Sequence, residues 1–314
     1  MVNIIQRRLL FLVTVVVSAA SWCAVLPWLM SADGSSGLSL TTARIGFVAG
    51  VLLLAVAGIG AMVLGAATSA MGGRLSGVMA ISLGLLVAAG RGGPIDGWIY
   101  GARTALPGSY LWLMVEVLVW QAGGVVMLLM VQKLRNPLTA RWPALAYEDH
   151  LEVDVVVSWP SAATLGATVL CAVIAGVLSY WLVRNSDGGQ VVGGVGVSFL
   201  VAAMITQLLM PKHPATGALF APALVALSAY GYVLLRFANE TSFLAGWYNL
   251  GYHSSASAVV PGPALALPVH YASAGVLGAA AGLAWARSMM AESSKPPAGA
   301  EVTACPEEAA VSSP

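Results

Sequence analysis

One carboxyl group, that of Glu116, stands well inside a long apolar stretch, Tyr110–Val131. A charged side chain near the middle of a membrane helix costs about 2.5–3.5 kcal/mol on insertion. Such residues usually face the interior of a helix bundle and often have a function. Gln121 follows on the same helix, and Trp112 and Trp120 share the face of Glu116 at a spacing of four residues. We therefore predict an intramembrane polar site at Glu116 and Gln121, suited to proton or cation coupling. The alternative is a hydrogen-bonded structural residue.

Other chemistries find little support in the sequence. No phosphate-binding loop, zinc-protease helix or nucleophile elbow is present. His253 and His270 could approach a metal ion, but nothing has the spacing of a third ligand. Cys23 and Cys171 fall in apolar segments and Cys305 in a polar tail, so a disulfide framework is not expected. We predict no catalytic residue, no metal, no cofactor and no enzymatic activity.

The composition is typical of a membrane protein. Hydrophobic residues make up 59% of the 314 residues, charged residues 9%, and the formal net charge is +1. Soluble globular chains are roughly 45–50% apolar, and a nucleic-acid partner would require a basic surface. We expect an all-α, polytopic integral membrane bundle whose partners are the lipid bilayer and either other membrane subunits or further copies of the chain. Richness in Ala, Gly and Val with few lysines favours a bacterial inner membrane.

Eight segments are long and apolar enough to be predicted as transmembrane helices, since a bilayer core needs about 20 residues. The third is the shortest, and the first, which follows Arg7 and Arg8, could instead be read as a signal peptide. Trp22 makes a poor cleavage site, so we predict that the first helix is retained. The segments are Leu9–Met30, Arg44–Ala67, Leu75–Gly90, Tyr110–Val131, Ala162–Val183, Val191–Met210, Gly217–Arg236 and Val269–Met290.

The longest polar interruption, residues 133–160, divides the predicted bundle (residues 1–290) into two four-helix halves. Its basic residues precede its acidic ones: Lys133, Arg135 and Arg141, then Glu148, Asp149, Glu152 and Asp154. Basic loops stay on the cytoplasmic side, so we predict a cytoplasmic loop with both chain termini on the same side. Residues 291–314 form a polar, low-complexity segment that is predicted to be a disordered cytoplasmic tail.

Two further loops are predicted on the outer side. Arg91–Ser109 is interrupted by Gly and Pro and carries Trp98 and Tyr100, aromatic residues that suit a membrane interface. Phe237–Pro268 is unusually long for a connection and rich in aromatic and small polar residues. We interpret it as packing at the outer interface, with a lid or a partner surface as the alternative.

Small residues recur at four-residue spacing on the last predicted helix, at Ala274, Gly278 and Gly282. Such a face lets another helix backbone approach closely, so we predict a helix-packing face there. The same spacing recurs at Gly46 and Gly50 and at Gly189 and Gly193. These features favour a non-enzymatic membrane component that packs with or scaffolds partners. The alternative function is a small-solute transporter or channel that uses the intramembrane carboxyl group.

Overall fold

The computed structural model describes residues 4–31, 38–102, 105–141, 161–211, 215–248 and 259–293. Helices connected by turns make up these residues, with no strand among them, which confirms the predicted all-α class. The longer helices are α1 (Ile4–Leu29), α2 (Phe47–Gly72), α3 (Arg74–Arg91), α5 (Tyr110–Arg141), α6 (Ala162–Leu182), α7 (Gly188–Leu209), α8 (Ala221–Arg236) and α11 (Val276–Ser293). The shorter ones are η1 (Leu40–Thr42), α4 (Ile95–Ala102), η4 (Ala215–Phe220), α9 (Glu240–Tyr248), η6 (Gly262–Leu265), α10 (Pro268–His270) and the π-helical η7 (Tyr271–Gly275).

The outer surface of the bundle is apolar, as a lipid-facing surface must be. On α2, for example, Val48, Leu52, Val56 and Ile59 are all exposed and share one side of the helix. Six of the described helices are long and apolar enough to cross a membrane. A seventh span is added if α3 and α4 count as one. The chain is therefore an integral, multi-pass helical membrane protein.

The predicted number of eight spans is not confirmed. The predicted last span is divided among α10, η7 and α11, and it is not one of the six apolar helices. The predicted third span corresponds to α3, which continues after a break into α4 at an angle of 58°. Eight crossings thus remain a prediction.

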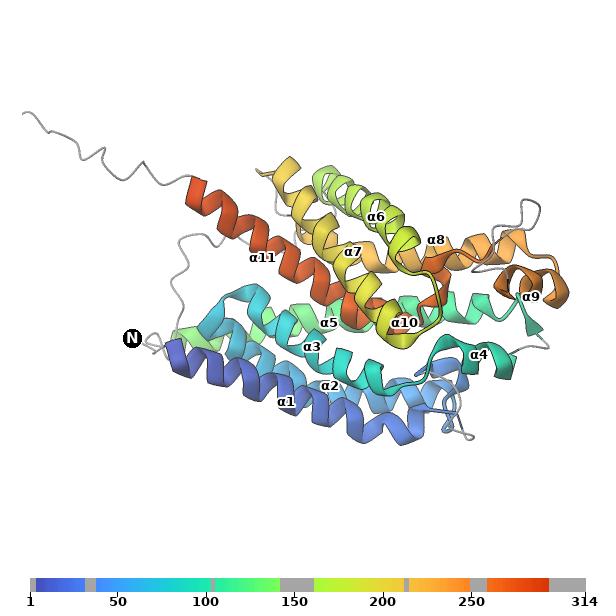
Figure 1. The fold of residues 1–314 in the computed structure, drawn as a ribbon. Helices are drawn as coiled ribbons and strands as arrows, with labels where there is room; N and C mark the ends of the chain where they lie inside the picture. The colour runs from blue at the N-terminus through green and yellow to red at the C-terminus, as the bar shows by residue number, and fades with distance from the viewer. Residues whose placement is uncertain are drawn as a thin grey trace, which may run out of the picture.

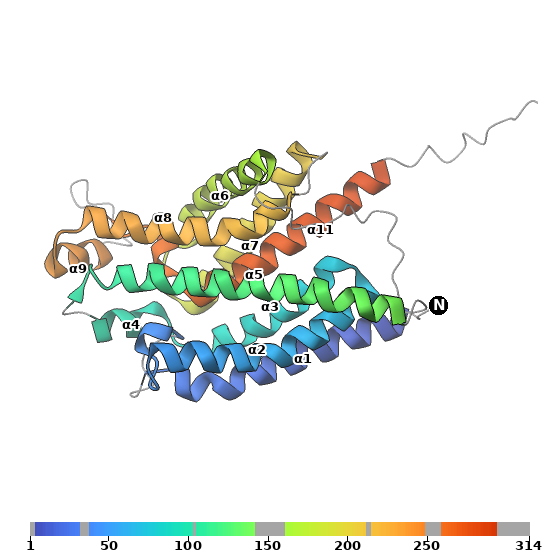
Figure 2. The ribbon, with the colours of Figure 1, turned by 180° about the vertical axis from the view of Figure 1, so that it is seen from behind.

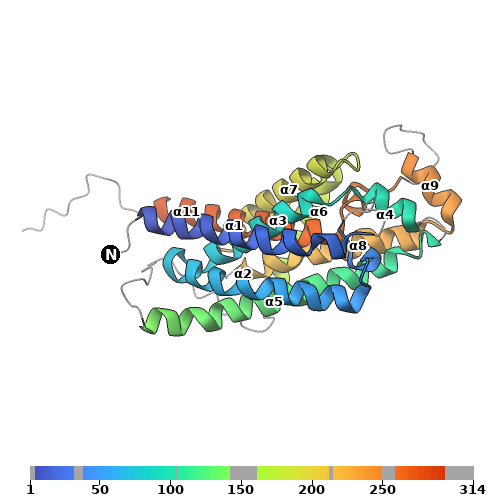
Figure 3. The ribbon, with the colours of Figure 1, turned by 90° about the horizontal axis from the view of Figure 1, so that it is seen from below.

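The helices form two groups that meet along α5 (Figure 1). In the first group α1, α2 and α3 pack against one another, and in the second α7 packs between α6 and α11. α5 contacts α2 on one side and α8 on the other, so it joins the two groups (Figure 2). The start of α1, the end of α5 and the end of α11 lie at the same end of the molecule (Figure 3).

The polar interruption predicted from residue 133 begins as helix, because α5 continues to Arg141. At about 1.5 Å per residue its 32 residues extend about 48 Å, well beyond a hydrocarbon core of about 30 Å. The last turns, with Lys133, Arg135 and Arg141, can therefore project from the membrane while remaining helical. Residues 142–160, which hold the acidic half of the predicted loop, lie outside the described residues, as do residues 294–314 of the predicted tail.

The predicted Gly/Pro-interrupted loop Arg91–Ser109 contains a helix, α4, and this part of the prediction is wrong. Gly92 and Pro94 end α3, but the apolar residues after them form a further amphipathic turn. Trp98 packs inside the bundle, with only 1% of its surface exposed, whereas its neighbour Tyr100 is 65% exposed. The sequence did not reveal this helix because its apolar periodicity extends over only a few residues and is obscured by the flanking glycines.

The described part of the long segment Phe237–Pro268 is helical in α9 and then deeply buried from Val260 to Leu267. Three buried tyrosine hydroxyls donate hydrogen bonds to its backbone carbonyls. Tyr271 donates to Pro263 at 2.6 Å, Tyr110 to Ala264 at 3.4 Å, and Tyr230 to Ala266. Backbone without helical pairing is tolerated inside a membrane protein only where the protein itself surrounds it. The tyrosines supply those missing partners. Residues 249–258, which include His253, lie outside the described part.

The structure places Ala274, Gly278 and Gly282 along the side of the last helix that faces α7. A methyl group added at Gly278 would overlap the carbonyl oxygen of Gly196, and one at Gly282 would overlap that of Leu200. The two backbones therefore lie in direct contact. This packing lies within the chain, a point that the sequence had left open.

Candidate functional site

Glu116 lies six residues into α5, on the face that carries the buried residues Tyr110, Leu113 and Val117. Its side chain is completely buried. The face is set by helical spacing, because positions 110, 113 and 117 bring the same side of α5 against the rest of the bundle. A buried carboxyl group needs hydrogen-bond donors around it, and the structure supplies them from the start of η1 and from α5 itself.

The first donors come from η1, between α1 and α2. The hydroxyl of Ser39 donates to Glu116 Oε2 at 2.6 Å. Ser39 is itself the N-cap of η1 and accepts from the backbone N–H of Thr41 at 3.3 Å. The first N–H groups of a helix have no partner within it. Glu116 thus binds the serine that caps a neighbouring short helix.

Two tryptophans extend the network. Trp120, one turn further along α5, donates its indole N–H to Glu116 Oε1 at 3.2 Å. Trp98, on α4, donates to the hydroxyl of Thr41 at 3.1 Å, and that hydroxyl shares a hydrogen bond of 2.7 Å with Ser39. The carboxyl group therefore connects α5, η1 and, through Thr41, α4. Its geometry is that of a structural anchor.

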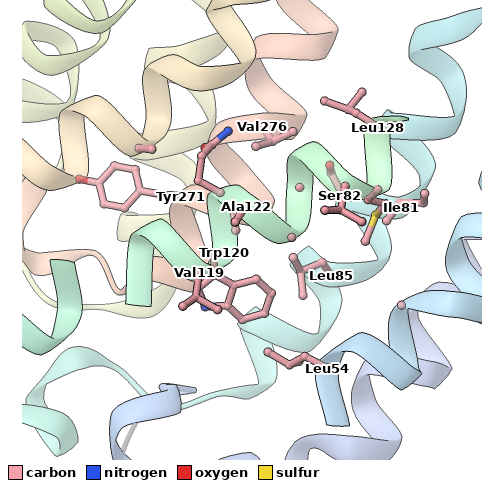
Figure 4. A pocket seen from close by; sticks show the side chains of 18 of the residues that line it. Leu54, Ile81, Ser82, Leu85, Val119, Trp120, Ala122, Leu128, Tyr271 and Val276 are labelled. Carbon is pink, nitrogen blue, oxygen red and sulfur yellow. The ribbon is translucent and has the colours of Figure 1, made fainter. Parts of the chain in front are cut away.

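A separate cavity of about 420 Å³ lies further along α5, where the two helix groups meet (Figure 4). Side chains from α1, α2, α3, α5, α8, η7 and α11 line it, among them Leu54, Ile81, Leu85, Trp120 and Val276. The lining is almost entirely apolar, with Ser82, Gln121 and three aromatic side chains, Trp22, Trp120 and Tyr271, as its polar-capable members.

The two predicted site residues do not share a location. Gln121 lines the cavity, whereas Glu116 does not. Among the residues that the structure describes, only Trp120 belongs to both places, because its indole N–H binds Glu116 and its side chain lines the cavity. Reasoning from helical spacing identified Trp120 but missed Ser39, Thr41 and Trp98. The sequence Ser-Leu-Thr-Thr at residues 39–42 indicates a possible helix cap, but nothing in it indicates that Ser39 binds Glu116, 77 residues away.

His270 does not come together with other potential metal ligands. It is buried, and its Nδ1 accepts the backbone N–H of Leu267 at 3.1 Å, which caps the start of α10. Among the residues that the structure describes, no group of three His, Cys, Asp or Glu side chains could hold a metal ion. The described side chains around Glu116 and the cavity therefore provide hydrogen bonding and apolar contact.

The fold and these two features define a multi-pass α-helical membrane protein with a buried carboxyl anchor and an adjacent apolar cavity. No protein-family model matches the chain, and no curated protein or solved structure is significantly similar to it.

Proposed function

We propose that this chain is a non-enzymatic component of a membrane assembly, which packs with and scaffolds partner membrane proteins. The observation that carries the proposal is the use of Glu116. Its carboxyl group accepts hydrogen bonds from Ser39 and Trp120, and it lies outside the cavity. A coupling group in a transporter must reach the solute pathway, whereas this group is engaged in holding the architecture.

The outward side of α7 suits a partner helix. Gly189 and Gly193 are exposed, one turn apart, and nothing lies within 4 Å of where a Gly193 side chain would begin. Gly193 borders a hollow of about 240 Å³ that Leu182 and Val197 also line. The inward side of α7 already receives the glycine face of α11 by direct backbone contact. We propose that the outward side receives a transmembrane helix of a partner protein in the same manner.

Crosslinking from α7 tests this assignment. A photo-crosslinking residue at Val197 should form one discrete protein adduct in native membranes. The same residue at Val169 on α6 should form none, although each valine is 51% exposed. Gly193→Leu should abolish the adduct, because the larger side chain prevents close approach. Gly166→Leu, at an equally open glycine on α6, should not. Equal adducts at both valines, or an adduct that survives Gly193→Leu, would contradict the proposal. An adduct between two copies of this chain would show that α7 forms a homo-oligomer and does not bind a different protein.

We further propose that the protein resides in a bacterial inner membrane with both termini in the cytoplasm. The excess of basic residues near the predicted inner ends supports this orientation. So does the position of the start of α1, the end of α5 and the end of α11 at one end of the bundle. Reporter domains fused after Asn136 and at the C-terminus should both be active only in the cytoplasm. A periplasmic signal from either fusion would be inconsistent with this topology.

A further inference from the structure

One polar group of the cavity lining has no partner within the described structure. Trp22, on α1, is 4% exposed, and its indole N–H is buried without a hydrogen bond. Buried donors are almost always paired, because an unpaired one loses its bond to water and gains nothing in return. The neighbouring indole of Trp120, whose ring centre lies 6.5 Å away, has its N–H engaged by Glu116. Trp22 is therefore a buried, unpaired donor of this cavity, in addition to the side chains of Ser82 and Gln121 in its lining.

The cavity opens toward the lipid. Ala55 on α2 and Ala122, Gly123 and Val126 on α5 line it and are also exposed on the apolar outer surface. A guest can thus enter sideways from the bilayer without crossing water. No residue of the described lining is charged, which disfavours the charged headgroup of a phospholipid. The guest should be neutral, apolar and able to accept a hydrogen bond.

The aromatic side chains of the cavity further restrict the class of guest molecule. Trp22 and Trp120 lie with their ring planes 55° apart. Tyr271 also belongs to the cavity lining, with its ring directed away from Trp120 (Figure 4). Such a set favours a flat ring in edge or offset contact. The backbone at Tyr271 is π-helical, an irregularity that is frequent at functional sites in helices.

We propose that this cavity binds a quinone with an apolar tail, taken from the bilayer. The ring lies among the aromatic side chains, a ring carbonyl accepts the N–H of Trp22, and the tail leaves through the lipid-facing opening. Quinones carry acceptors but no donors, which matches a lining whose unpaired buried group is a donor. The inference rests on the cavity alone and does not depend on the proposed partner helix at α7.

Equilibrium binding to the purified full chain in detergent tests the proposal. The probe is a benzoquinone with a decyl chain, and decylbenzene and methyl decanoate serve as comparison ligands. The quinone should bind saturably and more tightly than either. Trp22→Phe should weaken quinone binding about three- to tenfold, the value of one hydrogen bond, and leave decylbenzene binding unchanged. Trp28→Phe, on the same helix but exposed and outside the cavity, should have no effect.

A second pair of variants tests the route of entry. Ala55→Trp places a large side chain at the opening and should reduce quinone binding roughly tenfold or more. Gly60→Trp, exposed on the same helix but away from the cavity, should not. The proposal is overturned if the wild-type chain shows no saturable binding, if Trp22→Phe binds the quinone as the wild type does, or if methyl decanoate binds equally well. That last result would assign the cavity to lipid acyl chains.

Discussion

Replacing Glu116 with alanine should lower the free energy of unfolding by about 2 kcal/mol or more. The substitution leaves the hydroxyl of Ser39 and the indole N–H of Trp120 without their acceptor. Each donor left unsatisfied costs about 1–3 kcal/mol. The loss is measurable by denaturant unfolding or by the thermal midpoint in detergent. Gln121→Ala, five positions along the same helix and outside this network, serves as the matched control and should change little.

Two further variants separate anchoring from transport. Glu116→Gln keeps one acceptor oxygen and should restore part of the stability that alanine loses. Combined with Ser39→Ala it should give a non-additive double-mutant cycle, since the two side chains share a hydrogen bond. The transporter alternative expects instead that Glu116→Gln abolishes coupled flux in liposomes while the protein stays folded. Such a loss, with additive stability effects, would remove the anchor interpretation.

The second large effect is expected at the contact between α7 and α11. Gly278→Ala should destabilise the protein by about 1–3 kcal/mol or more, because the added methyl group meets the carbonyl oxygen of Gly196, and backbone cannot rotate aside as a side chain can. Gly282→Ala should behave in the same way against Leu200. The thermal midpoint and the yield of monodisperse protein both report the change.

Gly231→Ala on α8 is the matched control. Nothing lies within 4 Å of the position where its side chain would begin, so the alanine should be neutral or should stabilise the helix by up to about 1 kcal/mol. Equal losses of stability from Gly231→Ala and Gly278→Ala would contradict this prediction. They would show that the loss comes from replacing glycine itself and not from close contact between the backbones of α7 and α11.

The helices were predictable because long apolar segments have few alternatives in a membrane. α6, for example, ends within one residue of its prediction, since Ser161 caps its start and polar residues follow its end. The short, interrupted elements were not predictable. α4 lies between glycines, and the last span is divided by a π-helical turn at Tyr271–Gly275.

The candidate site was predictable in part. An intramembrane carboxyl group is visible in any hydropathy pattern, and helical spacing placed Trp120 beside it. What surrounds a side chain across the bundle depends on tertiary packing, which spacing along one helix does not contain. That is why the cap formed with Ser39 and the separation of Gln121 from Glu116 emerged only from the structure.

The three tyrosine hydroxyls on the carbonyls of residues 263–266 have a consequence for biogenesis. Tyr110 reaches Ala264 across 154 positions of sequence, and Tyr230 reaches Ala266 across 36. Three carbonyls of the segment Val260–Leu267 receive these tyrosine hydrogen bonds only when α5, α8 and η7 all surround it. Contacts of such long range form late in folding, and α5 and α8 are both synthesised before this segment. We therefore expect residues 260–267 to pack into the bundle only after those helices have been inserted into the membrane.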